Sequence, residues 1–478
     1  MRGAVFHSRR FPELDPLCDY GQTVARPWAA LYADSRKFSK RGSWGKVTSY
    51  SPLPGMPTHW YNFLRDLPAP MPEARDSGSP TAAEISAKIR PRTLIEQNAS
   101  DKQWVAIPEP VAEWLRQCGR PTPLHRAHRL EKHLGTGARI YLKREDVLPS
   151  GSFKLNTAIA QAYYAAEEGR TTLVTETGAG QWGMSVALAA QMFGLRAEIF
   201  MVRCSLEQKP YRRHYMELLG AEVGPSPSPR TAIGRKILGE NPGHPGSLGT
   251  AISDAIEHAL GNPSAAYLAG SGMPHVYLHQ TLLGLEVAEQ LKDVHGEDLG
   301  VDGRGDHLIA CSGGGSNLCG LIGPHLRAKA DGADLRFLAA ESTAAPRLTR
   351  GVYEYGRTDL GGFTPEVLGY TMGESFVPPP THVGGLRNHH SSALVSLLRR
   401  EGVLDAVAFD QRTALEAGRL LLRTEGLLLA PEAGHAVAAA LDVVAKADAE
   451  NLEPVIVILA SGSGFLDLRG YDEVLLDT

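Results

Sequence analysis

The chain has 478 residues, of which 43% are hydrophobic and 21% are charged, an ordinary composition for a globular enzyme of two or three domains. Its formal net charge is only -4 and like charges form no long runs, so neither nucleic acid nor a membrane surface is expected as a partner. The five cysteines form no CxxC pair and no His/Cys ligand spacing, so neither a disulfide framework nor a metal site is predicted, and a reducing cytoplasm fits best.

The N-terminal part of the chain is irregular in composition. Residues 1–55 mix Pro, Gly, Ser and basic residues without a sustained period, which predicts an irregular extension. Met56 is an alternative start, because THWYNFLRDLP directly after it is typical of the beginning of an ordered segment. Residues 56–135 contain a Pro-rich connector and short helical patterns, and we expect them to wrap a domain surface and in part to join a larger domain.

Strands and helices alternate from residue 138 onward. After a strand at 138–143, the pattern predicts helices at 156–168, 184–193 and 208–219 and strands at 172–175 and 196–202. This spacing implies right-handed crossovers and a parallel sheet. We therefore expect residues 136–270 to form a small α/β domain.

A second alternating pattern begins near Tyr277. It predicts strands at 307–311, 335–341 and 454–459, and helices at 277–292, from 318, at 411–425 and at 433–447. The section 343–392 has no sustained period, and loops of that length are commonly lids or binding loops. Residues 271–478 are therefore expected to form a larger α/β domain.

Lys154 is the first candidate for chemistry. It lies in or just before the first turn of a predicted helix, after the candidate N-cap residues Ser150 and Ser152. The helix dipole and the free N–H groups disfavour a cation there, so a buried ammonium should have a lowered pKa, which an amine needs to react with an aldehyde. For an isolated SxK pattern, a surface lysine beside a turn is the commoner situation.

The next strand ends in a carboxylate and a Gly-rich turn. Glu176 lies at the carboxyl end of the strand, where open α/β sheets place their ligands. The turn that follows presents backbone N–H groups that suit a substrate carboxylate, and it consists of Thr177, Gly178, Ala179, Gly180 and Gln181. Turns of this kind also serve simple packing.

A second Gly-rich turn joins an apolar strand to a helix, and its N–H groups converge in a geometry that suits a phosphate. It consists of Gly313, Gly314, Gly315, Ser316 and Asn317 after Ser312. The motif is neither GxxxxGK[ST] nor GxGxxG, which argues against a nucleoside triphosphate and a dinucleotide. A glycine turn required only for close packing is the alternative.

Three polar residues near the C-terminus complete the set of candidates. Ser461 ends the last strand, where a neutral hydroxyl suits a ring nitrogen, although a capping serine explains it equally well. Glu432 lies in the first turn of a helix, where the dipole favours a carboxylate in any case. His435 is more simply explained as a packed or capping histidine.

Taken together, these groups fit one ligand. An amine for an aldehyde carbon, a glycine cradle for a phosphate, a hydroxyl for a pyridine nitrogen and a turn for a carboxylate describe pyridoxal 5'-phosphate holding an amino acid. The chain resembles the second, longer type of tryptophan synthase β chain, within the fold type II pyridoxal-phosphate enzymes. The motifs that carry the resemblance run in family order from about Trp60 to Leu468 and include GRPTPL, YLKRED, GSFKLNTAIAQAYY, TETGAGQWG, KPYRR, GGGSN, APEAGHA and SGSG.

The resemblance implies two three-layer α/β/α domains with mainly parallel sheets and the cofactor between them. It implies that Lys154 forms the Schiff base and that Glu176 is the catalytic carboxylate beside indole. The implied cofactor contacts are Lys154, Asn156, Gly313, Gly314, Gly315, Ser316, Asn317, Glu432 and Ser461. The implied contacts to the substrate carboxylate are Thr177, Gly178, Ala179, Gly180 and Gln181.

By the same resemblance the reaction is a β-replacement on L-serine. Serine and indole would give L-tryptophan and water through an aminoacrylate, in a cytoplasmic homodimer. Whether an α-type subunit is also a partner stays open at this point.

Several positions depart from the family pattern. Phe153 replaces the usual histidine before the lysine, and SGMPH at 271–275, Met184, Asn388 and His390 also differ. We expect these departures to cluster around the pocket, so a specialised synthase that uses a substituted indole, a phenol or a thiol is an alternative. A serine or threonine deaminase is a second alternative, and a degenerate chain that only binds or scaffolds is a third.

Overall fold

The computed structural model describes residues 55–76, 78 and 80–476. By their contacts the described residues belong to a single unit. The extension predicted for residues 1–55 lies, apart from Gly55, outside the described residues. No helix in the described part of the chain combines the length and apolarity that a membrane crossing requires.

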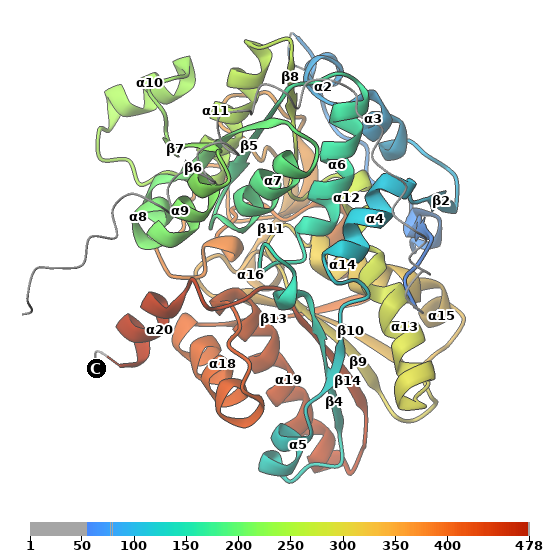
Figure 1. The fold of residues 1–478 in the computed structure, drawn as a ribbon. Coiled ribbons are helices and arrows are strands. Elements are labelled where there is room, and N and C mark those ends of the chain that lie inside the picture. The colour runs from blue at the N-terminus through green and yellow to red at the C-terminus, as the bar shows by residue number, and fades with distance from the viewer. Residues whose placement is uncertain (1–54, 77, 79, 477–478) are drawn as a thin grey trace, which may run out of the picture. The chain divides into compact units, whose positions relative to one another are not determined.

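The larger of two main sheets has six strands in the order β13-β10-β9-β14-β4-β3 (Figure 1). Its strands are β3 (Leu124–Arg126), β4 (Arg139–Arg144), β9 (Asp306–Cys311), β10 (Leu335–Ser342), β13 (Leu404–Phe409) and β14 (Val455–Ala460). All pairs are parallel except β3 with β4.

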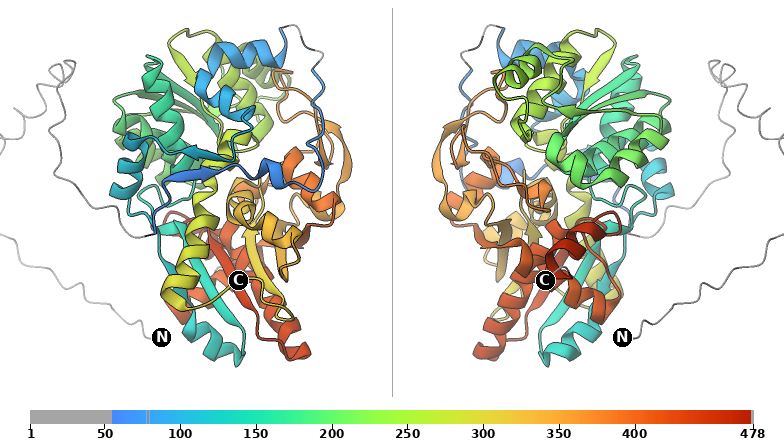
Figure 2. Two further views of the ribbon diagram at one scale, coloured as in Figure 1. Left: turned by 90° about the vertical axis from the view of Figure 1, so that its right-hand side faces the viewer. Right: turned by 90° about the vertical axis from the view of Figure 1, so that its left-hand side faces the viewer.

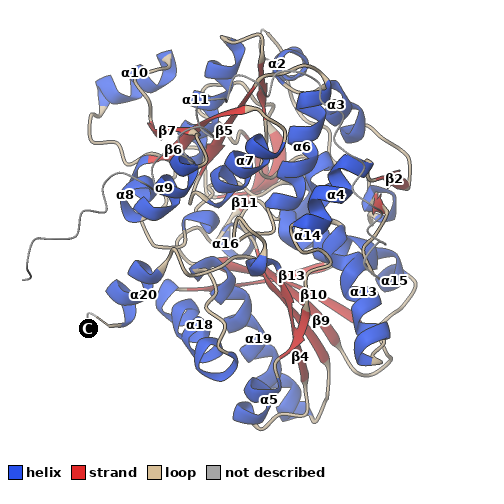
Figure 3. Ribbon diagram, viewed as in Figure 1, coloured by secondary structure: helices blue, strands red, loops and turns tan. Residues whose placement is uncertain are grey.

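Alternate residues of each central strand belong to different apolar cores. On β14, Val455 and Val457 pack with α13 (Leu282–His295) and α14 (Ser316–Ile322), whereas Ile456 and Ile458 pack with α18 (Gln411–Glu425) and α19 (Pro431–Glu450). A parallel sheet covered by helices on both faces explains why these strands are almost continuously apolar (Figure 3).

The smaller sheet has four parallel strands in the order β7-β6-β5-β8. The strands are β5 (Thr172–Thr177), β6 (Arg196–Val202), β7 (Glu222–Ser226) and β8 (Ala265–Tyr267). One face packs against α6 (Leu155–Glu167), α7 (Gln181–Met192) and α9 (Pro210–Leu218), and the other against α2 (Ala82–Ile89) and α11 (Leu248–Leu260). In the side views, each of the two sheets, with the helices that cover it, is seen as a separate layered half (Figure 2).

Helix ends follow local sequence signals. Helix α18 begins where Asp410 accepts a hydrogen bond from the Thr413 N–H at 3.0 Å, and it ends at Gly426, whose φ of 75° is left-handed. The predicted range of 411–425 is therefore confirmed. The remaining helices are α3 (Arg92–Asn98), α4 (Glu109–Gln117), α5 (His128–Leu134), α8 (Arg203–Gln208), α10 (Ala232–Glu240), α12 (Pro274–Gln280), α15 (Leu326–Ala330), α16 (Arg347–Arg350), α17 (Ala393–Arg400) and α20 (Leu468–Leu475).

Two expectations about organisation need correction. The strand expected to open the small domain, β4, pairs in parallel with β14 and lies in the six-stranded sheet (Figure 1). The section 343–392 is not wholly irregular, because β11 (Val352–Gly356) and β12 (Val367–Thr371) form an antiparallel hairpin. A further pair of short strands, β1 (His59–Tyr61) and β2 (Trp104–Ala106), was also not expected.

Candidate active site

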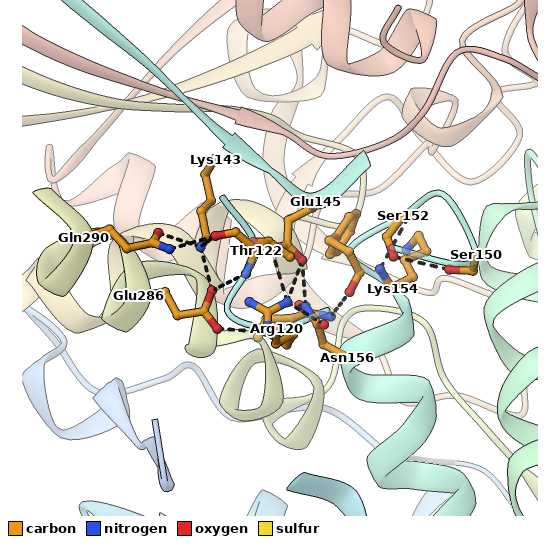
Figure 4. Close-up of polar contacts among 12 residues, drawn as sticks. Arg120, Thr122, Lys143, Glu145, Ser150, Ser152, Lys154, Asn156, Glu286 and Gln290 are labelled. Atoms are coloured by element: carbon orange, nitrogen blue, oxygen red, sulfur yellow. Dashed lines mark hydrogen bonds and ion pairs between the residues drawn. The ribbon is translucent and has the colours of Figure 1, made fainter. Parts of the chain in front are cut away.

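Lys154 lies just before the first turn of α6, as the sequence predicts, but it is itself the N-cap residue, so the candidates Ser150 and Ser152 do not cap this helix (Figure 4). Its Nζ donates a hydrogen bond to the Gly270 carbonyl at 3.2 Å and lies 5.0 Å from the centroid of the Phe153 ring. Burial lowers the pKa of Lys154 to about 8, so the predicted direction is confirmed, but loss of hydration rather than the helix dipole is its main cause. A substantial fraction of this amine is neutral near pH 8.

Glu176 is buried at the carboxyl end of β5. One of its carboxylate oxygens accepts a hydrogen bond from the Tyr267 hydroxyl at 2.7 Å. Burial raises the pKa of Glu176 to about 7, although the Tyr267 hydrogen bond partly opposes this shift. A carboxyl group with such a pKa can both accept and release a proton near neutrality.

The turn after Glu176 is held by side chains around it. Gly180 has a left-handed φ of 99° and caps α7, and the Thr177 hydroxyl accepts hydrogen bonds from the Gly180 and Gly183 N–H groups at 3.2 Å each. Arg212 donates to the Ala179 carbonyl at 2.7 Å. The turn is therefore fixed, and the first N–H groups of α7 have no acceptors within the helix.

A cavity of about 510 Å³ joins these groups. The sequence-predicted residues that line it are Lys154, Glu176, Thr177, Gly178, Ala179, Gln181 and Gly314. Gly314 belongs to the six-stranded half and Glu176 to the four-stranded half, so the cavity lies between the two sheets. This volume is in the ordinary range for a small-molecule site.

The second Gly-rich turn connects β9 to α14 and is tightly packed. A Cβ on Gly314 would lie 1.9 Å from the Ser271 Oγ, and one on Gly313 would lie 2.1 Å from the Gly385 carbonyl oxygen. Close packing therefore requires these glycines, which agrees with the alternative that the turn serves packing. The buried hydroxyls of Ser271 and Ser312 also find no hydrogen-bond partner among the described residues, and unpaired donors beside a helix N-terminus fit a phosphate.

Ser461 is buried next to both the lysine segment and the glycine turn. Its Oγ lies 3.5 Å from the Sγ of Cys311, the residue before Ser312, and its carbonyl accepts a hydrogen bond from the Phe153 N–H at 3.2 Å. The amine of Lys154, the glycine turn and the Ser461 hydroxyl thus lie on adjoining segments. Ser461 itself does not line the cavity, so its contact with the cofactor ring stays a prediction.

Glu432 is buried, with one carboxylate oxygen accepting the Gly385 N–H at 2.9 Å and the other unpaired among the described residues. Burial alone would raise the pKa of Glu432, but the charges of Lys209 and Arg212 and the Gly385 N–H together lower it. His435 is fully buried and bonded through Nδ1 to the Pro431 carbonyl at 2.9 Å. It is the packed histidine that the sequence predicts.

Two of the predicted cofactor contacts use their side chains elsewhere. The amide of Asn156 bonds to Arg120, Glu145 and Gln280 (Figure 4). The amide of Asn317 donates to the Cys311 carbonyl at 2.8 Å. Both side chains hold neighbouring segments in place, and neither lines the cavity.

Most of the positions that depart from the family pattern line the cavity, as expected. Ser271, Met273, Asn388 and His390 line it. Met184 does not, because its side chain packs in the core beneath α7. The ring of Phe153 is buried beside the amine of Lys154 rather than in the cavity wall.

Sequence reasoning missed two residues of this site. Tyr267, the hydrogen-bond partner of Glu176, ends the short strand β8, and Arg90 is the C-cap residue directly after helix α2. Both line the cavity. No local motif marks them, because tertiary packing brings them to Glu176.

Comparisons with known proteins agree with this geometry. Residues 115–462 match the family model described as pyridoxal-phosphate dependent enzyme. The chain is 47% identical over 423 residues to a tryptophan synthase beta chain of Thermococcus onnurineus, covering 88% of this chain and 94% of that one. It is 48% identical over 418 residues to tryptophan synthase beta chain 2 of Thermotoga maritima, covering 87% and 97%.

Solved structures with low sequence identity share the fold. The processed form of threonine deaminase isoform 2 from Solanum lycopersicum superposes with a TM-score of 0.55 at 18% identity, covering 91% of this chain and 99% of that one. A fungal L-serine ammonia-lyase from Rhizomucor miehei gives 0.53 at 20% identity, covering 74% and 96%. The architecture is thus fold type II, and the chain belongs to the pyridoxal-phosphate-dependent enzymes, within the tryptophan synthase β-chain family.

Proposed function

We propose that the protein joins L-serine to indole and releases L-tryptophan and water. The observation that carries the proposal is a single cavity lined both by an amine with a lowered pKa, Lys154, and by a carboxyl group with a raised pKa, Glu176. The relatives at 47% and 48% identity, both named tryptophan synthase beta chains, support the choice of substrates.

The residues of the cavity divide the chemistry between them. The bound cofactor supplies an aldehyde and a ring that takes up the electrons left when serine loses its α-proton. Lys154 would hold that aldehyde, and its neutral amine would take up the α-proton of serine bound in its place. The N–H groups of residues 177–181 hold the serine carboxylate.

Glu176 acts on the second substrate. Indole becomes positively charged when its C3 attacks the β-carbon of serine, and the Glu176 carboxylate accepts the indole N–H at that stage. The Tyr267 hydrogen bond orients the carboxylate. Glu176 therefore serves carbon–carbon bond formation and not the loss of the serine hydroxyl.

Three further groups hold the cofactor in this proposal. Residues 313–317 hold its phosphate, Ser461 contacts the ring nitrogen and Glu432 lies near the ring. A hydroxyl, unlike an aspartate, does not keep a pyridine nitrogen protonated, so electron uptake by the ring is limited. This favours loss of the serine hydroxyl over transamination.

A second candidate is a synthase that uses a different nucleophile, such as a substituted indole, a phenol or a thiol. Ser271, Met273, Asn388 and His390 in the cavity wall favour it, because they depart from the family pattern where the second substrate would enter. A deaminase is a third candidate, in which water completes the reaction after serine loses its hydroxyl.

One experiment separates these candidates. The cofactor-loaded protein is incubated with L-serine, with and without indole, and the products are identified by chromatography and mass spectrometry. Tryptophan formed only with indole supports the proposal. Pyruvate formed at the same rate with and without indole supports the deaminase, and serine consumed only with another nucleophile supports the second candidate.

We further propose that the active form is a cytoplasmic homodimer, as the family resemblance implies. The four cysteines that the structure describes, Cys118, Cys204, Cys311 and Cys319, are free thiols, which suits a reducing compartment. Sedimentation of the purified protein tests the dimer, and co-purification with an α-type chain tests that partner.

A further inference from the structure

Arg90 is a buried cation without an ion-pair partner. Its side chain is only 8% exposed and lines the cavity. Its guanidinium makes no hydrogen bond to any described residue, and Nη1 is fully buried and unpaired. A charge removed from water without a partner is costly, so a partner in the cavity would stabilise it.

No carboxylate forms a direct ion pair with Arg90 among the described residues, although the charge of Glu176 acts on it from beyond Tyr267. Its Cζ lies 4.9 Å from the centroid of the Tyr267 ring, and the Tyr267 hydroxyl is committed to Glu176. Asp76 also lines the cavity, but one of its carboxylate oxygens accepts the Ala82 and Ala83 N–H groups at 2.8 and 3.4 Å. No carboxylate of the described residues lies within ion-pair distance of Arg90.

Five apolar side chains also line this cavity. Ile85 and Ile89 of α2 line it, together with Ile252 and Ile256 of α11 and Phe363. Tyr267 lies between Arg90 and Glu176, so Arg90 is on the side of the cavity where the proposed second substrate binds. An apolar wall with one cation suits an aromatic molecule that carries an anionic group.

We propose that Arg90 binds a carboxylate on the second substrate, so that the preferred nucleophile is an indole with an acidic substituent on its benzo ring. This inference rests on the proposed function. A guanidinium and a carboxylate pair through two parallel hydrogen bonds, which fixes orientation as well as supplying affinity.

The alternative is that Arg90 acts through its neighbours. Stacked on Tyr267, it would orient that phenol and thereby Glu176, whichever nucleophile is bound. The two roles differ in a measurable way. Recognition of a carboxylate affects only acidic nucleophiles, whereas support of Glu176 affects neutral and acidic nucleophiles equally.

The test compares benzo-ring indole carboxylates with their neutral carboxamides and with indole. Binding to the cofactor-loaded protein is measured by calorimetry without serine, and kcat/KM is measured with serine. The variants are Arg90→Met and Arg90→Lys, and the control is Arg92→Met. Arg92 lies two residues further on, with a side chain that is 86% exposed.

In the parent, we expect at least one carboxylate to bind about ten- to a hundredfold more tightly than its carboxamide. In binding without serine, Arg90→Met removes this preference but leaves the affinity for indole within about twofold, Arg90→Lys restores part of the preference, and Arg92→Met changes nothing. In kcat/KM, loss of the Arg90 charge also raises the pKa of Glu176, so turnover of neutral and acidic nucleophiles falls by a common factor in addition to the loss of the preference. The inference is overturned if no carboxylate is preferred in the parent, or if Arg90→Met weakens binding of indole and the carboxylates equally.

The two proposals fail separately. If indole reacts with serine but the carboxylates show no preference, the role of Arg90 is wrong and the proposed function stands. If no indole reacts although serine loses its hydroxyl, the proposed function is wrong. If calorimetry then shows that the parent binds a carboxylate more tightly than its carboxamide, and that Arg90→Met does not, Arg90 is still identified as the anion site.

Discussion

Glu176 controls the pH dependence of the proposed reaction. Because burial raises its pKa to about 7, the carboxylate needed to accept the indole proton is lost as the pH falls below 7. We expect the carbon–carbon bond-forming step to decline about tenfold per pH unit below pH 7, whereas loss of the serine hydroxyl, which needs the neutral Lys154 amine, declines already from about pH 8. Single-turnover rates of the two steps across pH 5–9 provide the measurement.

Substitution of Glu176 separates loss of the serine hydroxyl from carbon–carbon bond formation. Glu176→Ala should spare loss of the serine hydroxyl and slow carbon–carbon bond formation by about a hundredfold or more. Tyr267→Phe, which removes the hydrogen bond but not the carboxylate, should have a smaller effect. If Glu176→Ala slows both steps to the same extent, the role given to this carboxylate is wrong.

Lys154 is expected to be essential for turnover but not for folding. Lys154→Ala should lower serine consumption by about a thousandfold or more, because both the covalent link and the base are lost. Without cofactor, the unfolding temperature of the variant should be at least as high as that of the parent, because the change removes a poorly hydrated ammonium. Serine assays and thermal unfolding test this pair of outcomes, and turnover at the parent rate would refute it.

At the residue scale the sequence predicts the groups that belong to local motifs. Lys154, Glu176 and the two glycine turns lie at strand ends or helix starts, where periodicity and cap signals place them. The roles of the predicted site residues remain predictions. Tyr267 and Arg90 reach the cavity only through packing of α2 and β8 beside β5, which no single segment encodes.

At the scale of elements, one buried arginine joins α9 to the turn after Glu176. Arg212 donates to the Ala179 carbonyl at 2.7 Å and also pairs with the buried Asp467. Arg212→Met should loosen the turn and raise the KM for serine about tenfold, with a smaller change in kcat. Steady-state kinetics with serine varied would measure both quantities.

The same helix supplies a matched control. Arg213 is its neighbour, with a side chain that is 45% exposed and paired with Glu217 on the same helix. Arg213→Met should leave the KM for serine unchanged. Equal effects of the two substitutions would show that Arg212 acts through general stability and not through the turn.

The sequence predicts where helices and strands lie more easily than it predicts which strands pair. The alternation of strands and helices correctly indicates parallel sheets, and caps such as Asp410 and Gly426 fix the ends of α18. The same pattern cannot say which sheet a strand joins, and β4 pairs with β14 from the far end of the chain. The hairpin β11–β12 was missed because its strands are short and only half-buried.

At the scale of the whole molecule, a buried ionic network links helices α6 and α13 to strand β4 of the six-stranded sheet (Figure 4). Glu286 on α13 accepts from Arg120 at 2.9 Å and from Lys143, at the end of β4, at 2.6 Å. Arg120 also bonds to Glu145 and to Asn156 of α6, whose N-cap is Lys154. The network thus connects the helix that presents the lysine to the six-stranded half.

Removing one member should be costly, because it leaves buried charges uncompensated. We expect Glu286→Gln to lower the free energy of unfolding by about 3–5 kcal/mol. Glu289→Gln, an exposed position on the same helix, should change it by less than about 0.5 kcal/mol. Denaturant unfolding of both variants gives the comparison, and equal midpoints would show that the network contributes little.

The most direct measurement is the location of the covalent attachment. Purified protein loaded with the cofactor is reduced with borohydride, digested, and mapped by mass spectrometry. A pyridoxyl phosphate group on Lys154, and on no other lysine, is the predicted result, because Lys154 alone among the described lysines with a lowered pKa lines the cavity. An unmodified Lys154, with the adduct absent or on another residue, would contradict the proposed active site.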